Sequence, residues 1–258
     1  MIETGFPNLA SKGHIIAHRG ASRAAPENTL SAFRAAHAQG VNWVEFDVSL
    51  LGDLTPVVHH DGTLDRCTTG HGSLKAIDRA ALSDIRAGKL HGTAFQDEPL
   101  PTLDDTLDLL DGLGMYANLE MKTHDDPPGA MAGLVHRALT ERDWTTGRVI
   151  VSSFDHHELA ELRRLMPGIA IAALWDDPPA DFRRTLTDLK AAALHINYPF
   201  LSQSLLQEAT SFGFDLRVFT VNDPKVMAPF RQHGLTSVIT DHPPLFLDDP
   251  DWARWAAT

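Results

Sequence analysis

The sequence predicts a (β/α)8 barrel, or TIM barrel, with a small insertion at approximately residues 61–101. Its 258 residues are 43% hydrophobic, which is enough for one domain of barrel size. Eight short apolar runs alternate with segments of helical spacing, the order expected of parallel strands joined by helices. The alternative is an open doubly wound sheet, but no glycine-rich nucleotide-binding motif follows the first run, where the residues read HRGASRAAPENT. We therefore expect residues 1–258 to form a single barrel domain.

The first two barrel strands are predicted close to the N-terminus. His14–His18 is a short apolar run, and Glu27–Gln39 has apolar residues at helical spacing before Gly40 ends the helix. Asn42–Ser49 is the second run. Together the three segments predict the first β–α–β unit of the barrel.

A hairpin is predicted to follow the second strand. Pro56–His60 is another extended run, and the link Leu50–Thr55 is too short for a crossover helix. Pairing is symmetric about a turn, so a turn near Asp53 would bring His60 back beside Asp47.

The segment after the hairpin is predicted to be an insertion. Asp61–Pro101 is rich in Gly, Thr and polar residues and contains one helical pattern, Asp78–Ala87. Thr102 then caps a helix that runs to about Leu113, with two acidic residues in its first turn.

Six further strands bring the total to eight. The predicted strands are Tyr116–Met121, Val149–Ser152, Ile169–Leu174, Ala192–Ile196, Leu216–Val221 and Ser237–Thr240. The predicted helices between them are Pro128–Arg142, His156–Met166, Asp181–Leu189, Ser202–Gly213 and Pro224–His233. An acidic segment near the C-terminus precedes Trp252 and Trp255, which we expect to anchor a last docked helix.

Composition bears on nucleic-acid binding, on the cellular compartment and on membrane association. The formal net charge is −12, which makes the chain a poor binder of nucleic acid. Cys67 is the single cysteine, so no internal disulfide can form, as in proteins of a reducing compartment. The N-terminal residues show no signal-peptide pattern, and no apolar run approaches membrane-spanning length. We expect a cytoplasmic protein without stable membrane association; no feature specifies an oligomeric state.

Two carboxylates on one predicted strand give the first indication of chemistry. Glu45 and Asp47 are two residues apart, so they point to the same face, while Phe46 points into the packing. An apolar strand keeps such a pair if a cation neutralises it, most simply a divalent metal ion. The alternative for the pair alone is an edge strand with two solvated acids.

Other reactive side chains fall at the same ends of neighbouring strands, where barrel enzymes place their sites. His18 and Arg19 end the first strand, the hairpin brings His60, and Glu120 and Lys122 lie together on the third. A structural protein has no need of this set on one rim.

The residue types point to a phosphodiester hydrolase. Glu45, Asp47 and Glu120 offer hard oxygen ligands that suit Mg²⁺ or Ca²⁺. Arg19 and Lys122 suit the remaining phosphate oxygens. The two histidines, His18 and His60, can serve as general acid and base near neutral pH.

The remaining polar residues near these strands are assigned structural roles. His59 must face away from His60, and His14 lies at the far end of its strand. His156 and His157 follow a helix-capping Asp and are expected at the surface. We expect Asp61 to orient its loop and not to bind metal.

An ordered set of motifs resembles the glycerophosphodiester phosphodiesterase family, most closely its bacterial cytosolic branch. The set covers nearly the whole chain and consists of His18-Arg19-Gly20, Pro26-Glu27-Asn28-Thr29, Glu45-Phe46-Asp47, His60-Asp61 with Leu64-Asp65-Arg66, Glu120-Met121-Lys122 and Thr240-Asp241. The resemblance implies a barrel with an insertion after the second catalytic histidine. It also implies a divalent metal ion and cleavage of small glycerophosphodiesters to glycerol 3-phosphate and an alcohol.

Carried over by matching motif, the resemblance assigns roles to individual residues. It makes His18 and His60 the acid–base pair, and it makes Glu45, Asp47 and Glu120 the metal ligands. It assigns phosphate binding to Arg19 and Lys122, and it assigns metal or substrate binding to Asn28. Phe219 stands where the family often has an aromatic residue, and it either lines the glycerol pocket or belongs to the core. The chain departs from the family in the hairpin turn, Leu51–Leu54, and at Cys67, where a threonine is usual. Trp175 and Asn197 are weaker candidates for the site.

Three other functions compete with this interpretation. A phospholipase D-like activity on lysophospholipids or sphingomyelin would need a lipid-binding surface, and Leu90 and Phe95 are too few to predict one. A catalytically silent binding protein is disfavoured because every acid, base and ligand position is filled. A glycosidase could use paired carboxylates but would not need two histidines with Arg19 and Lys122.

Overall fold

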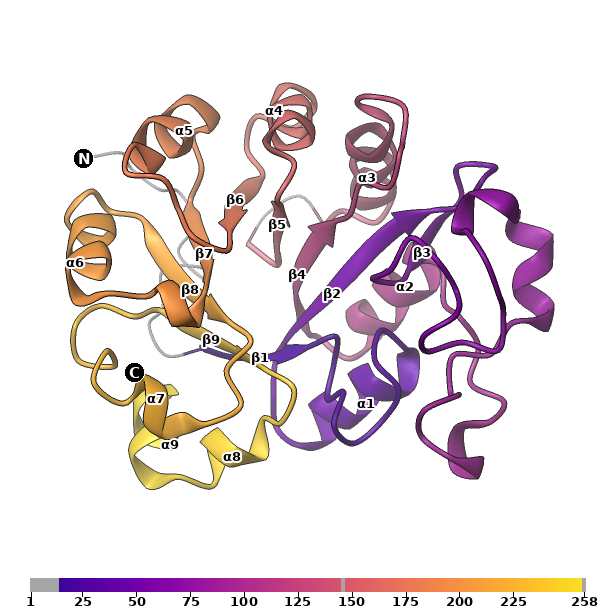
Figure 1. The fold of residues 1–258 in the computed structure, drawn as a ribbon, viewed down its shortest axis with the longest axis horizontal. Helices are drawn as coiled ribbons and strands as arrows, with labels where there is room; N and C mark the ends of the chain where they lie inside the picture. Colours follow the sequence, from indigo (N-terminus) through magenta and orange to yellow (C-terminus); the bar gives the residue numbers. More distant parts are fainter. Residues whose placement is uncertain (1–13, 145–146, 257–258) are drawn as a thin grey trace.

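Eight parallel strands close into a barrel in the computed structural model, which describes residues 14–144 and 147–256 (Figure 1). β1 (His14–His18) pairs with both β2 (Trp43–Leu50) and β9 (Ser237–Thr240), and these two pairings close the sheet. The strands between them are β4 (Tyr116–Met121), β5 (Val149–Ser153), β6 (Ala170–Trp175), β7 (Ala193–Asn197) and β8 (Asp215–Phe219). The predicted (β/α)8 barrel is confirmed, and an open doubly wound sheet is excluded.

The remaining strand forms the predicted hairpin. β3 (Pro56–Val58) runs antiparallel to β2, with Val48 opposite Val58 and Leu50 opposite Pro56. This register is the one that a turn centred near residue 53 requires. The backbone N–H of His59 donates to the carbonyl of Asp47, so the chain returns to the predicted carboxylate strand.

Helices cover the outside of the barrel, one after most of the strands (Figure 1). They are α1 (Leu30–Ala38), α2 (Leu103–Gly112), α3 (Ala130–Glu141), α4 (His156–Leu165), α5 (Phe182–Leu189), α6 (Gln203–Ser211), α7 (Pro224–Met227), α8 (Pro244–Leu247) and α9 (Pro250–Ala256). Thr102 and Asp105 form a reciprocal capping box on α2, as its predicted cap requires. Gly40 follows the end of α1 with φ +83°, a conformation that suits glycine.

Two predicted helices are wrong in length or type. Asp78–Ala87 contains only a 3₁₀ helix, η2 (Arg79–Asp84), with no buried residue, so no packed face sustains an α-helix there. The helix predicted over Pro224–His233 is the four-residue α7, because Pro229 has no N–H to continue the helical hydrogen bonds and its ring crowds the carbonyl four residues earlier. The insertion also holds η1 (Leu74–Ala76) and η3 (Thr93–Phe95).

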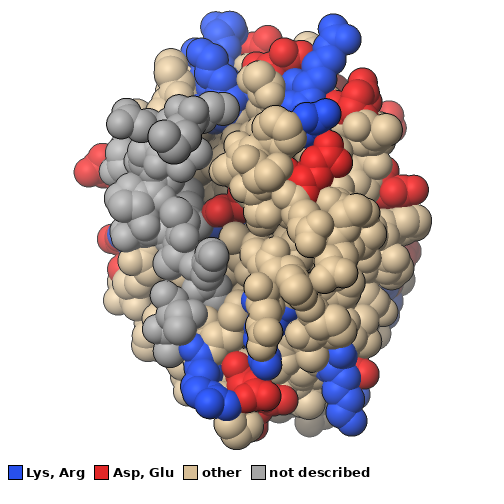
Figure 2. All heavy atoms as spheres, turned by 90° about the vertical axis from the view of Figure 1, so that its left-hand side faces the viewer, with Lys and Arg blue, Asp and Glu red and all other residues tan. Residues whose placement is uncertain are grey.

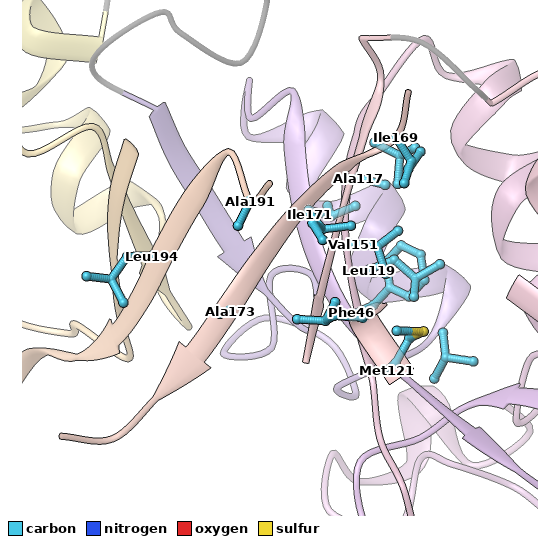
Figure 3. Close-up of a cluster of buried hydrophobic side chains, with 14 of the residues drawn as sticks. Phe46, Ala117, Leu119, Met121, Val151, Ile169, Ile171, Ala173, Ala191 and Leu194 are labelled. Atoms are coloured by element: carbon cyan, nitrogen blue, oxygen red, sulfur yellow. The ribbon is translucent and has the colours of Figure 1, made fainter. Parts of the chain in front are cut away.

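Strand alternation sorts the core into an outer and an inner layer. Figure 3 shows outward-facing side chains of the barrel wall, among them Phe46, Leu119, Val151 and Ile171, which pack between strands and helices. The Phe46 ring lies 5.6 Å from the ring of Phe33 on α1, and both rings are fully buried. Glu45 and Asp47, on alternate positions, therefore face the barrel interior.

The insertion and the C-terminus pack on the barrel through apolar side chains. Leu64, Leu74 and Ile85 of the insertion cluster with Leu51 and Val57 of the hairpin. Trp252 is 1% exposed, and its ring lies 5.1 Å from that of Phe246, so the predicted docking of the last helix is confirmed.

Two features bear on possible partners: the length and hydropathy of the helices, and the distribution of charged side chains on one side of the molecule. A bilayer crossing would require a longer and more apolar helix than any in the described part of the chain. On the side shown in Figure 2, the coloured Lys and Arg residues lie mostly near the two ends, with Asp and Glu residues close by. Among those residues the basic side chains form no continuous face. Residues 1–13, the larger part of the N-terminal stretch considered for a signal peptide, lie outside the described part.

Candidate active site

Three buried carboxylates meet inside the barrel at the C-terminal ends of two adjacent strands. Glu45 and Asp47 come from β2, Glu120 comes from β4, and the strand register places Asp47 directly opposite Glu120. One oxygen of each carboxylate lies within 4.8 Å of the other two. The residues are 3%, 1% and 8% exposed, so the solvated edge-strand alternative is wrong.

The electrostatics of this cluster call for a cation. Burial, together with repulsion from Asp47, raises the pKa of Glu120 to about 7 and raises the pKa of Glu45 well above its usual range. Burial also opposes ionisation of Asp47, but Arg19 and Lys122 outweigh it and lower its pKa. Glu45 Oε1 accepts no hydrogen bond within the described part of the chain. Three hard oxygen donors around a shared space fit a divalent cation.

Two cations border the carboxylates. The Arg19 Nε atom lies 3.1 Å from Asp47 Oδ2, and the Arg19 backbone N–H donates to Glu45 Oε2 over 3.0 Å. Lys122 contacts Glu120 and places Nζ 3.3 Å from Asp47 Oδ1. Arg19 adopts φ +56°, an uncommon left-handed conformation at a non-glycine residue. Neither cation is more than 16% exposed in its side chain, so both charges act in a poorly solvated space.

Asn28 holds the central carboxylate from the loop after β1. Its Nδ2 donates to Asp47 Oδ2 over 2.8 Å, and its Oδ1 accepts from the Asp47 backbone N–H over 3.2 Å. Asn28 is buried and also has a positive φ, +57°. This reciprocal pair orients Asp47.

Each of the two candidate catalytic histidines is paired with an aspartate. His18 Nδ1 lies 2.6 Å from Asp241 Oδ1, and His60 Nδ1 lies 2.6 Å from Asp61 Oδ1. Burial opposes ionisation of both aspartates, but their hydrogen bonds outweigh it and lower the pKa of Asp241 to about 2 and that of Asp61 below its usual range. Ionised carboxylates only accept hydrogen bonds, so both Nδ1 atoms carry protons. Each Nε2 is left for chemistry; that of His18 lies 3.9 Å from Glu45 Oε2.

A pocket of about 430 Å³ opens above these groups. His18, His60, Arg19 and Lys122 line it on one side. Burial, which outweighs the attraction of Asp47, lowers the pKa of His60, so its imidazole favours the neutral form. The pocket therefore combines a neutral imidazole, positive side chains and a carboxylate cluster, the groups needed to bind a phosphate and move protons around it.

An ionic network links the insertion to this pocket. Arg66 Nη1 donates to Glu27 Oε2 over 2.7 Å, and Arg66 Nε donates to Asp61 Oδ2 over 2.6 Å. Glu27 also accepts from Arg19 Nη1 over 2.7 Å, and Asp61 holds His60. One insertion residue therefore connects the guanidinium of Arg19 with the imidazole of His60.

The weaker candidates lie at or near the pocket. Phe219 lines its wall, with its ring 6.1 Å from that of Phe154, and Asn197 lines the rim. Trp175 packs 4.6 Å from the ring of His156, which is half-buried and not fully at the surface as expected. The sequence alone did not single out Phe154.

The residues assigned structural roles lie outside the pocket lining. His59 is buried and its Nε2 lies 2.9 Å from the Thr63 carbonyl oxygen. The His14 ring lies 5.4 Å from Trp43, on the other end of β1 from His18. The role of Asp241 was missed, although Thr240-Asp241 was one of the matching motifs, because no local pattern pairs it with His18.

Comparisons with known proteins point to one family. The model of the family described as "Glycerophosphoryl diester phosphodiesterase family" matches residues 18–245. A glycerophosphodiester phosphodiesterase of Caldanaerobacter subterraneus is 32% identical over 230 residues, 89% of this chain and 94% of that protein. A glycerophosphodiester phosphodiesterase of Bacillus subtilis is 29% identical, and the match covers 93% of this chain and 89% of that protein.

Solved structures share the fold of this chain. A phosphodiesterase of Oleispira antarctica, in complex with the product sn-glycerol-3-phosphate, has a TM-score of 0.84 and 32% identity, with 90% of this chain and 94% of that chain covered. The glycerophosphodiester phosphodiesterase of Thermotoga maritima has a TM-score of 0.73 and 26% identity, and the match covers 91% of this chain and 96% of that chain. The chain belongs to the glycerophosphoryl diester phosphodiesterase family and is a hydrolase of that class.

Proposed function

We propose that the protein uses one divalent metal ion, Mg²⁺ or Ca²⁺, to hydrolyse small glycerophosphodiesters such as glycerophosphocholine and glycerophosphoethanolamine. The products are sn-glycerol 3-phosphate and an alcohol. The observation that carries the proposal is the meeting of three buried carboxylates and two His–Asp pairs around one pocket.

Glu45, Asp47 and Glu120 would hold the metal ion. When bound, the ion supplies positive charge that polarises a phosphate oxygen and offsets charge developing on it. Asn28 fixes the orientation of Asp47 in advance, since it contacts both the side chain and the backbone of that residue.

Arg19 and Lys122 bind the phosphate on the other side. Their charges already face the carboxylate cluster, and both side chains are fixed by several partners, so little reorganisation is needed when substrate binds. Phe219 lies deeper in the pocket and offers an apolar face to the glycerol carbon skeleton.

His18 and His60 move the protons. Cleavage of the P–O bond requires one group to take a proton from the attacking oxygen and another to give a proton to the departing alkoxide. Asp241 and Asp61 hold the Nδ1–H of each ring, so each Nε2 can accept or return one proton. The product in the Oleispira structure, sn-glycerol-3-phosphate, supports the same product here.

We also propose that residues 1–258 act as one domain, with approximately residues 61–101 as its insertion, and that the protein works in the cytoplasm. The insertion packs on the hairpin and has contacts to the active site, which supports a joint role. A single, buried cysteine suits a reducing compartment.

Replacement of the histidines tests the proposed chemistry. His18→Ala and His60→Ala should each lower sn-glycerol 3-phosphate release by about 10²-fold or more, because each removes one proton-transfer group. A dehydrogenase-coupled assay with glycerophosphocholine measures the release, and circular dichroism checks the fold. Near-wild-type turnover by a folded variant would remove that histidine from the mechanism. His157→Ala, on the exposed first turn of α4, is the matched control.

A further inference from the structure

The rim of the pocket carries a carboxylate that the chemistry above does not use. Asp176 follows β6 and lines the pocket beside Asn197, whose Nδ2 donates to Asp176 Oδ1 over 3.1 Å. Asp176 is exposed, and the described part of the chain places no Lys or Arg nitrogen within 4.0 Å of its carboxylate. Its negative charge is therefore available to a ligand.

An aromatic wall leads from the barrel interior to this rim. Phe219 is half-buried and also lines a small cavity beneath the pocket with Leu174 and Ile239. Phe154, in edge-to-face contact with Phe219, is 44% exposed. Phe219 is thus the deeper of the two rings. Lys122 Nζ lies 5.7 Å from the centroid of the Phe154 ring, and the exposed part of that ring lies near the pocket mouth.

The pocket is polarised along its length. The positive side chains Arg19 and Lys122 lie at the carboxylate cluster, whereas Asp176 is at the rim. Every glycerophosphodiester has the same glycerol and phosphate, and only the alcohol differs. With phosphate at the two cations and glycerol against Phe219, the alcohol extends past Phe154 toward Asp176.

The chemistry of this outer part suits a positive charge. A carboxylate next to an open aromatic ring binds ammonium and quaternary ammonium groups through ion pairing and cation–π attraction. A neutral polyol would gain only hydrogen bonds there, and Asn197 already occupies one of the carboxylate oxygens.

Resting on the proposed function, we propose that Asp176 and Phe154 form a head-group subsite that favours cationic alcohols such as choline and ethanolamine over neutral ones. Asp176 is a specificity-determining residue, since it contacts the departing alcohol and not the reacting phosphorus. Its contribution concerns binding, so it changes kcat/KM between substrates.

The test compares four substrates with wild type and Asp176→Asn at saturating Mg²⁺ and low ionic strength. Two are cationic, glycerophosphocholine and glycerophosphoethanolamine, and two carry neutral alcohols, glycerophosphoglycerol and glycerophosphoinositol. We expect the ratio of kcat/KM for cationic over neutral substrates to fall about five- to tenfold in the variant. The wild-type preference should also shrink as salt is added, because exposed charges are screened.

Asp177→Asn is the control, since it removes the same charge from the exposed neighbouring residue, and it should leave the ratio unchanged. Phe154→Leu keeps an apolar side chain but removes the ring face, so it should lower the choline preference as well.

An equal loss on all four substrates would assign Asp176 to the common glycerol part and overturn the inference. An unchanged ratio in Asp176→Asn would also overturn it. A wild-type enzyme that hydrolyses none of the four would overturn the proposed function instead, which is a separate result.

Discussion

At the scale of single residues, Asp241 sets the tautomer of His18. Its carboxylate accepts the Nδ1–H and also accepts from Ser22 Oγ and Asn222 Nδ2. Three donors on one ionised carboxylate fix its position, and the ring of His18 is fixed with it. The active form of the imidazole therefore depends on a residue from the end of the last strand.

Asp241→Asn should lower kcat by about 10²- to 10⁴-fold, because an amide can donate to Nδ1 and stabilise the wrong tautomer. Steady-state kinetics over a range of pH measures the effect, and the pH profile should change together with kcat. Asp188→Asn, an exposed change on α5, is the control. Unchanged kcat and pH profile would show that Asp241 does not position His18.

Asp241 also makes stability depend on pH. Its ordinary pKa is 3.8, and the folded state lowers this pKa to about 2 although burial opposes the shift. Its carboxylate therefore stabilises the fold above about pH 4, and this contribution is lost as pH falls toward 2. The side chain is 34% exposed, so solvent reduces the effect to about 1 kcal/mol. Urea unfolding should show wild type more stable than Asp241→Asn at pH 7 and the difference narrowing at pH 3. A difference that widens with acid would contradict this account.

Residue-level prediction succeeded where local geometry was sufficient. The period of a strand places Glu45 and Asp47 on one face, and the hairpin symmetry returns His60 to them. The pairing of His18 with Asp241 joins residues 223 positions apart, so no local pattern contains it. The left-handed backbone of Arg19, which contacts Glu45 and Asp47 from distant parts of the sequence, likewise has no local signal.

At the scale of elements, α3 depends on a neighbouring helix for its cap. Its N-cap, Gly129, has no side chain to satisfy the first N–H groups. Glu158 of α4, 2% exposed, accepts from the Gly129 and Ala132 N–H groups over 2.5 and 2.8 Å. One buried carboxylate thus joins two helices of the outer layer.

Glu158→Ala should lower the free energy of unfolding by about 2 kcal/mol, since it removes the acceptor of the buried Ala132 N–H and of the partly buried Gly129 N–H. Glu161→Ala on the same helix removes only a surface ion pair with Arg164. It should change the free energy of unfolding by less than about 0.5 kcal/mol. Denaturant unfolding of both variants measures the difference. Equal effects would show that the cap contributes no more than the surface pair.

The insertion acts on catalysis through Arg66. Arg66→Met breaks the link between Glu27 and Asp61, so His60 and Arg19 lose part of their support and kcat should fall about tenfold. Arg66→Lys should recover part of the activity, and Arg79→Met, an exposed change in the same insertion, should leave it unchanged. Comparing kcat with the melting temperature separates an effect on the position of His60 and Arg19 from an effect on folding stability. If kcat falls only as far as the melting temperature falls across the variants, Arg66 has a purely structural role.

At the scale of the whole molecule, the alternation of apolar runs and helical patterns was sufficient to predict the barrel. The strands are buried by helices outside and by side chains inside, so both faces select apolar residues and the signal is strong. The insertion lacks such a repeat, because η2 buries no residue and its shape depends on contacts with the hairpin. The barrel then explains the site, since closure of the sheet brings β9 and its neighbour Asp241 next to β1 and His18.

The central claim is that a metal ion held by Glu45, Asp47 and Glu120 is required for hydrolysis of glycerophosphodiesters. The most direct measurement is sn-glycerol 3-phosphate release from glycerophosphocholine before EDTA, after EDTA and after addition of Mg²⁺ or Ca²⁺. We expect EDTA to abolish release and one of the two ions to restore it, and Glu45→Gln to raise the concentration of ion needed. Full release in the presence of EDTA would contradict the assignment of the three carboxylates as the metal site.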